Sequence, residues 1–144
     1  MIHGLLSSGA MPALERMVQF TGARHRVLSH NVANLSTPNF RPRELDPAEF
    51  QAELSRAIDK RRQTKHPTRG ELEMRSTRQL RFHDDGIEVR ARPADENILF
   101  HDRNNRDLER MMQDIAENTL MHNAGIDLLR SELSLLKTAI RERI

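Results

Sequence analysis

Histidines and paired carboxylates are the side chains of this sequence that could carry metal or acid–base chemistry. The chain has seven histidines and no cysteine, so a zinc site would need histidine and carboxylate ligands at close spacing. His25 and His30 are five residues apart, which on a helix directs their side chains about 140° apart. The other histidines are scattered, without a His-Glu-x-x-His spacing. We therefore predict no metal site and no cofactor.

The sequence likewise shows no motif for nucleophilic catalysis or for phosphate binding. Asp84 and Asp85 precede Gly86, an arrangement typical of a turn rather than of an acid–base pair. The sequence has no glycine-rich phosphate loop and no convincing serine–histidine–aspartate set. We predict that the protein is not an enzyme and takes no small-molecule substrate.

Residues 29–40 end a long helical pattern with a specific stop. Pro38 disfavours the helical conformation at the residue before it and cannot continue the hydrogen-bond ladder. Asn34 tolerates the left-handed conformation of many helix ends, and asparagine after proline is turn chemistry because it accepts a positive φ. The motif residues are Asn31, Val32, Ala33, Asn34, Thr37, Pro38, Asn39 and Phe40.

A helix is predicted over residues 12–34, ahead of this stop. Proline at position 12 suits a first turn, and most apolar side chains fall within one half of the circumference. The candidates for coiled-coil packing on that face are Leu14, Met17, Val18, Val27 and Leu28. Polar residues share the arc, and we predict that they set the register against neighbouring chains: Thr21, Arg24, His25 and Asn31.

The segment 105–143 carries a second, longer helical pattern. Ten positions alternate spacings of four and three, and eight of them are apolar, which is typical of a heptad seam. These positions are Leu108, Met112, Ile115, Thr119, His122, Ile126, Leu129, Leu133, Leu136 and Ile140. We predict that His122, too, helps to set the register against neighbouring chains. A second apolar row (Met121, Leu128, Leu135) predicts packing against more than one neighbour.

The stretch between these helices is more polar. Asp46 as N-cap and Pro47 predict a short helix within residues 35–54. Residues 55–104 form a polar middle segment, predicted to be partly disordered. Residues 86–92 alternate apolar and polar side chains, and we predict a short β-hairpin in which residues 98–100 pair with them.

Composition indicates a single domain, residues 1–144, with little material for a core. Hydrophobic residues make up 37%, charged residues 31% and aromatic residues 3%, so the chain is expected to finish folding on partners. No apolar run approaches the roughly 18 residues of a membrane span. Residues 56–92 hold eleven Lys/Arg against six Asp/Glu, which keeps open the alternative of a soluble coiled-coil adaptor that binds nucleic acid.

The motif at residues 31–40 resembles the N-terminal signature of bacterial flagellar rod, hook and hook-associated proteins. That signature reads Asn-hydrophobic-Ala-Asn, two variable residues and Thr-Pro-Gly-Tyr; here Asn39 replaces the glycine and Phe40 the tyrosine. Residues 104–109 (Asn-Asn-Arg-Asp-Leu-Glu) and 135–140 (Leu-Leu-Lys-Thr-Ala-Ile) look like the C-terminal region of proximal rod proteins. The resemblance is therefore to the basal-body rod family.

This resemblance implies a mainly α fold in which the N- and C-terminal amphipathic helices pack as a coiled-coil hairpin. It implies a structural subunit that self-assembles into the flagellar rod, transmits torque and encloses the export channel. The implied partners are other rod subunits, membrane-ring and rod-junction proteins and the export apparatus, with no nucleic acid expected. It also implies a periplasm-spanning location, reached by export without a cleaved signal peptide.

Overall fold

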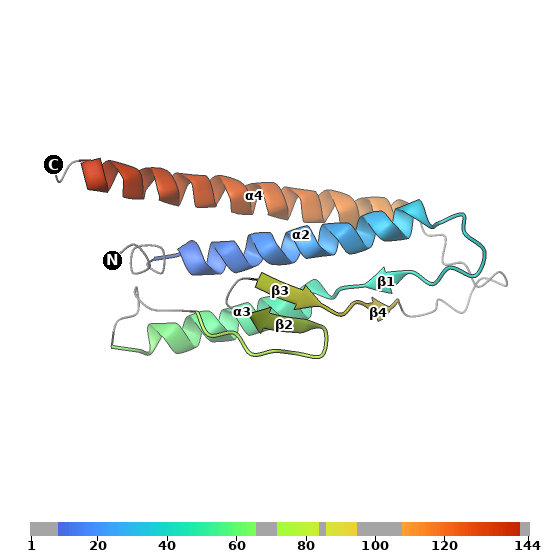
Figure 1. The fold of residues 1–144 in the computed structure, drawn as a ribbon, viewed down its shortest axis with the longest axis horizontal. Helices are drawn as coiled ribbons and strands as arrows, with labels where there is room; N and C mark the ends of the chain where they lie inside the picture. The colour runs from blue at the N-terminus through green and yellow to red at the C-terminus, as the bar shows by residue number, and fades with distance from the viewer. Residues whose placement is uncertain (1–8, 66–71, 84–85, 95–107, 142–144) are drawn as a thin grey trace.

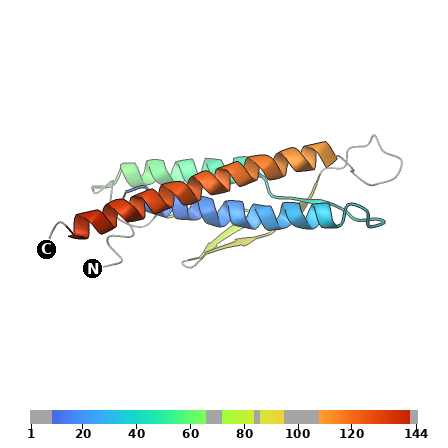
Figure 2. The ribbon, with the colours of Figure 1, turned by 90° about the horizontal axis from the view of Figure 1, so that it is seen from above.

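Three helices and four short strands make up the described part of the computed structural model, which covers residues 9–65, 72–83, 86–94 and 108–141 (Figure 1). α2 lies with α4 on one side and with α3 and the strands on the other (Figures 1 and 2). The elements are α2 (Met11–Ala33), β1 (Arg43–Glu44), α3 (Pro47–Arg62), β2 (Leu80–His83), β3 (Gly86–Val89), β4 (Arg92–Pro93) and α4 (Leu108–Arg141). The predicted mainly helical fold, with the first and last helices packed together, is confirmed.

The predicted stop of the first helix is present, with one difference in its geometry. α2 ends at Asn34, whose side-chain Nδ2 donates to the carbonyl of His30 at 2.8 Å. Asn34 itself has φ −105°, so it is not left-handed. The left-handed residue is Asn39, with φ 59°, because the turn after Pro38 needs a residue that tolerates positive φ. Asn39 thus adopts the positive φ at the position where the family signature has glycine.

The main core lies between α2, α3 and the β2–β3 hairpin. The rings of Phe20 and Phe50 stack with centroids 4.1 Å apart and planes 4° from parallel. Leu45 and Leu80 complete the buried cluster. Half-buried side chains pack around it: Leu54, Met74, Phe82, Ile87 and Val89. This small core therefore lies on the side of α2 away from α4.

The middle of the chain holds more regular structure than predicted. Asp46 is the N-cap of α3, as expected, and its Oδ1 accepts the Ala48 N–H at 2.8 Å. The helix continues to Arg62 rather than ending near residue 54, because Ala57 and Arg61 are buried against its neighbours. Three basic residues in its last turn also suit the negative end of the helix dipole.

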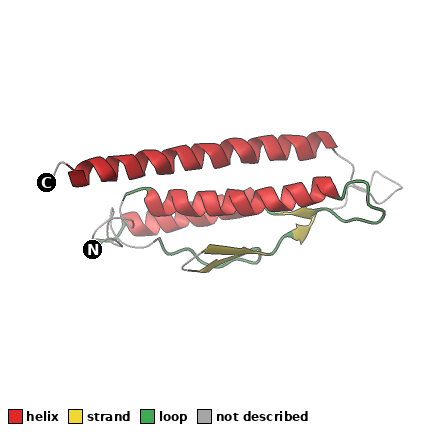
Figure 3. Cartoon of the chain, turned by 45° about the horizontal axis from the view of Figure 1, so that its top comes forward, coloured by secondary structure: helices red, strands yellow, loops and turns green. Residues whose placement is uncertain are grey.

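The predicted β-hairpin exists, but with a different partner strand. β3 pairs antiparallel with β2, and the two strands lie side by side in Figure 3. The register places Leu80 opposite Val89 and Phe82 opposite Ile87. This register buries Leu80 and directs the alternate side chains of both strands to the core. β4 pairs instead with β1. The predicted partner, residues 98–100, lies outside the described residues.

The described residues lack two features of other classes of protein. No helix there is both long and apolar enough to cross a membrane. Among the same residues, no group of three or more histidine, cysteine or carboxylate side chains is placed to hold a metal ion.

Candidate assembly interface

A layer of polar side chains joins α2 to the antiparallel α4. Asn118 is 1% exposed, and its Nδ2 donates to the Thr21 carbonyl at 2.9 Å. The Thr21 hydroxyl donates to the Met17 carbonyl at 2.9 Å and lies 2.8 Å from Nδ1 of His122. Since that hydroxyl has one proton, we assign Nδ1 of the imidazole as the donor in this contact.

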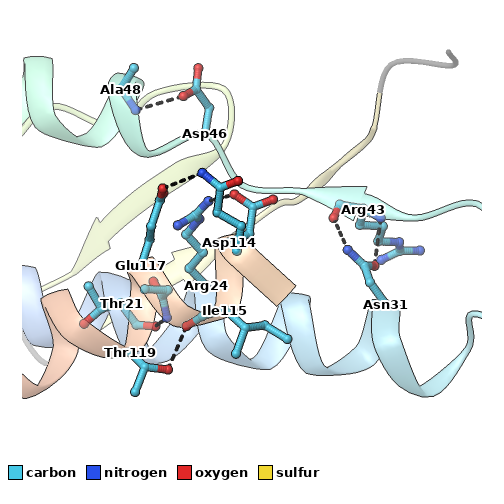
Figure 4. Close-up of polar contacts among 12 residues, drawn as sticks. Thr21, Arg24, Asn31, Arg43, Asp46, Ala48, Asp114, Ile115, Glu117 and Thr119 are labelled. Carbon is cyan, nitrogen blue, oxygen red and sulfur yellow. Dashed lines mark hydrogen bonds and ion pairs between the residues drawn. The ribbon is translucent and has the colours of Figure 1, made fainter. Parts of the chain in front are cut away.

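An ion pair extends this layer along the two helices. Arg24, whose side chain is 9% exposed, donates to Oδ1 of Asp114 at 3.1 Å (Figure 4). Asp114 is one helical turn from Asn118, so the pair continues the same line of contacts. Removing only the carboxylate would leave a largely desolvated guanidinium, which is unfavourable.

Close approach of the two helices depends on a glycine. A Cβ atom at Gly125 would lie 3.0 Å from Cγ2 of Val18, tighter than ordinary carbon–carbon contact. Gly125, Asn118 and Met111 are seven residues apart, and all three are buried. They form the column of α4 that meets α2, and we call it the inner column.

The predicted seam on α4 is divided by this arrangement. Six of its ten members are half-buried: Ile115, Thr119, His122, Ile126, Leu129 and Leu136. Four are exposed, by 37–57%: Leu108, Met112, Leu133 and Ile140. The inner column starts at Met111, one residue before the predicted Met112. Counting apolar residues missed it because a buried asparagine and a glycine carry no apolar signal.

On α2, the residues predicted for coiled-coil packing agree better with the observed burial than those of the α4 seam do. Leu28 is buried, and Leu14, Met17 and Val18 are half-buried. Val27 is half-buried too, but it lies beside Arg43 and Val89, away from α4. The polar residues, however, find partners within their own chain. Thr21 and Arg24 of α2 contact His122 and Asp114 of α4, respectively, whereas His25 is exposed. Their observed bonds join α2 to α4 within one chain, and a role in register against neighbouring chains stays a prediction.

Asn31 of the sequence motif also acts within the chain. Its Nδ2 donates to the Arg43 carbonyl at 2.6 Å, and its Oδ1 accepts the Arg43 N–H at 2.9 Å (Figure 4). Asn31 is 4% exposed, so both bonds are shielded from water. The ring of Phe40 lies near His30, with centroids 5.5 Å apart. The motif thereby fixes the path of the chain from α2 into β1.

Replacing Asn31 with alanine should lower the free energy of unfolding by about 1–3 kcal/mol, because both Arg43 backbone groups would lose their partner. The measurement is urea denaturation followed by circular dichroism. The matched control is Asn123→Ala on the exposed surface of α4, which should cause no loss. Equal stability of the two variants would contradict a role for Asn31 in holding β1.

Comparison with known proteins decides the family. No protein-family model matches the chain. A flagellar basal body rod protein FlgB of Cereibacter sphaeroides is 30% identical over 120 residues, which cover 82% of this chain and 83% of the relative. The chain belongs to the FlgB family of flagellar basal body rod proteins. An FlgB from another strain of this species is 29% identical over 123 residues, with the same shares of both chains covered.

FlgB of Yersinia enterocolitica extends the match, with 23% identity over 141 residues, 93% of this chain and 95% of the relative. These relatives confirm the resemblance to the basal-body rod family. An FlgB-family rod subunit is a structural protein, which confirms that the chain is not an enzyme.

The FlgB-family chain keeps an apolar surface on α4 that the described residues leave uncovered. Seven large apolar side chains are between 37% and 71% exposed. They are Leu108, Met112, Leu120, Leu128, Leu133, Leu135 and Ile140, and we call this set the outer α4 face. It occupies both flanks and part of the back of the helix, in keeping with the two apolar rows of the sequence.

Proposed function

We propose that this rod subunit joins its neighbours through the outer α4 face, while the α2–α4 pair keeps each subunit rigid. A rod subunit needs surfaces that many copies can cover. The exposed leucine, methionine and isoleucine side chains of α4 supply apolar area that association would remove from water. This uncovered surface is the observation that carries the proposal.

The way in which subunits repeat follows from the shape of such a contact. When one surface of a subunit meets a different surface of the next, the contacts do not close into a dimer and can build a helical shaft. Torque would then pass through many apolar contacts rather than through a single site. In this scheme α2 and α4 are the helices nearest the export channel of a proximal rod.

The proposed partners are other rod subunits, further copies of this chain, membrane-ring and rod-junction proteins, and the export apparatus during transit. The basic middle segment gives the nucleic-acid alternative little support. Several of its cations already pair with carboxylates, as in Lys60–Glu73 at 2.6 Å and Arg62–Asp59 at 3.7 Å. Membership of the FlgB family also accounts for the chain as a structural rod subunit, so nucleic-acid binding is not needed to explain it.

The test is the location of an internally tagged chain. An epitope inserted within residues 66–71, in a strain that still swims, avoids both long helices. Hook–basal bodies are purified, stripped of the outer filament and immunoblotted beside the cytoplasmic fraction. We expect the tag in basal bodies. A tag confined to the cytoplasm of a swimming strain would contradict assembly into the rod.

A further inference from the structure

An open groove of about 320 Å³ lies on the side of α2 that faces away from α4. α2, β1 and the segment around β3 form its walls, which are close together in Figure 1. Its lining residues are Arg26, Val27, His30, Arg43, Val89 and Ala91. His30 is nine residues from Thr21, which contacts α4, and nine residues place two side chains about 180° apart on a helix. The groove is therefore separate from the outer α4 face.

The charges of the groove are not balanced by the lining. Arg26, His30 and Arg43 are all exposed, and the described residues of the lining include no carboxylate. Within the described ranges, neither the Arg26 nor the Arg43 guanidinium forms an ion pair with a carboxylate. Two fixed positive charges at one groove, without a counter-charge, attract an anionic group from outside.

The described carboxylates near the groove are Glu88 and Glu44, and neither pairs with Arg26 or Arg43. Glu88 lies 3.6 Å from both Arg90 and His83, and it alternates with Val89, so it points to the opposite face of β3. Glu44 stands opposite Arg92 in the β1–β4 register. Glu88 therefore serves other cations, and within the described residues no ion pair joins Glu44 to Arg26 or Arg43.

The floor of the groove restricts the kind of anion. Val27, Val89 and Ala91 are half-buried and apolar. A phosphate group would be held by the cations alone and would leave this floor in water. A peptide with a carboxylate next to an aliphatic side chain would pair with the arginines and cover the floor as well.

We infer that the groove binds an acidic segment of a neighbouring protein chain, with a carboxylate between Arg26 and Arg43 and an aliphatic side chain over Val27 and Val89. The subunit then has two contact surfaces, one apolar on α4 and one cationic on the opposite side of α2. Opposed, chemically different surfaces suit a repeating contact that does not close. The inference rests on the chain being a rod subunit and adds the chemistry of its second partner.

The first experiment compares incorporation into basal bodies. Arg26→Glu with Arg43→Glu should reduce the ratio of subunit to ring protein in purified basal bodies by about tenfold or more, because a charge-assisted contact is replaced by repulsion. Arg26→Lys with Arg43→Lys should retain much of it. The matched control is Arg78→Glu with Arg81→Glu, the same charge change at exposed arginines outside the groove.

Stability of the free subunit separates binding from folding. Circular dichroism melting of the purified full chain should be the same for wild type and the Arg26→Glu/Arg43→Glu variant. A lower melting temperature would mean that the two arginines serve their own fold, and would overturn the inference. Normal incorporation of that variant would also overturn it, while wild-type signal in basal bodies would leave the rod function intact.

The second experiment identifies the occupant. A photo-crosslinking residue replaces Ala91, and the same residue replaces exposed Ser134 of α4 as the control position. Mass spectrometry of crosslinked basal bodies should find at position 91 a peptide of another chain with Asp or Glu beside an aliphatic residue. Crosslinks within the same chain, or to peptides without a carboxylate, would overturn the inference. So would binding of the purified chain to phosphatidylglycerol vesicles that Arg26→Glu/Arg43→Glu abolishes.

Discussion

Replacing Phe20 with alanine should lower the free energy of unfolding by about 3–5 kcal/mol. Phe20 is 1% exposed, and its ring stacks on Phe50 with centroids 4.1 Å apart. The substitution removes the stacking partner and leaves a cavity between α2, α3 and the β2–β3 hairpin. Small domains are typically stable by only about 5–15 kcal/mol, so much of the margin of this aromatic-poor chain would disappear.

Urea denaturation followed by circular dichroism measures this loss, since the chain has no tryptophan for fluorescence. Leu120→Ala is the control, because Leu120 is 71% exposed and its truncation should change stability little. Phe20→Leu should lie between the two, since it keeps part of the buried volume. A loss below about 1 kcal/mol for Phe20→Ala would show that the Phe20–Phe50 contact is not the centre of the fold.

Aspartate at Met112 and Ile140 should prevent incorporation into the rod and leave the free subunit folded. The two side chains are 57% and 51% exposed, so the monomer loses little when they change. In an assembled rod, burial of two unpaired carboxylates would be strongly unfavourable, by several kcal/mol each. We expect the amount of subunit in basal bodies to fall by more than about tenfold and swimming to stop.

The matched control is Ser131→Asp with Ser134→Asp, which adds the same two charges at exposed positions of the same helix. This control should swim and incorporate normally. Circular dichroism melting should be unchanged in both double variants. Swimming of the Met112→Asp/Ile140→Asp strain would show that the outer α4 face stays in water in the rod.

Local rules predicted the end of α2 and the start of α3, although not the end of α3. Asn34 caps the end of α2, Asn39 takes the positive φ of the turn that follows, and Asp46 with Pro47 begins α3, because each acts through its own backbone or through a bond to a residue close in sequence. The overall arrangement of the first and last helices was also predictable, since both patterns are long and amphipathic.

Two features needed the three-dimensional structure. The inner column of α4 contains Asn118 and Gly125, whose burial depends on what stands opposite: the Thr21 carbonyl for one and Val18 for the other. Likewise, the role of Asn31 depends on β1 returning beside α2. In each case the partner is distant in sequence, and no periodicity reports it.

The β2–β3 pairing was different, because a signal was present. Leu80 and Phe82 alternate with Arg81 and His83, as in a strand with one buried face. The many basic residues before them made the segment read as loop. The basic composition of the segment before β2 thus concealed the alternation of apolar and polar side chains in residues 80–83.

The polar and small residues between α2 and α4 make the stiffness of the subunit depend on its surroundings. Bulk water has a high dielectric constant and competes for hydrogen bonds, so pairs such as Arg24–Asp114, with Asp114 one-third exposed, add little rigidity to a lone subunit. When neighbours cover the outer α4 face and exclude water, the same bonds strengthen without any change in their geometry. We therefore expect the α2–α4 pair, which already joins the two helices in a lone subunit, to become stiffer still when the subunit is part of the shaft.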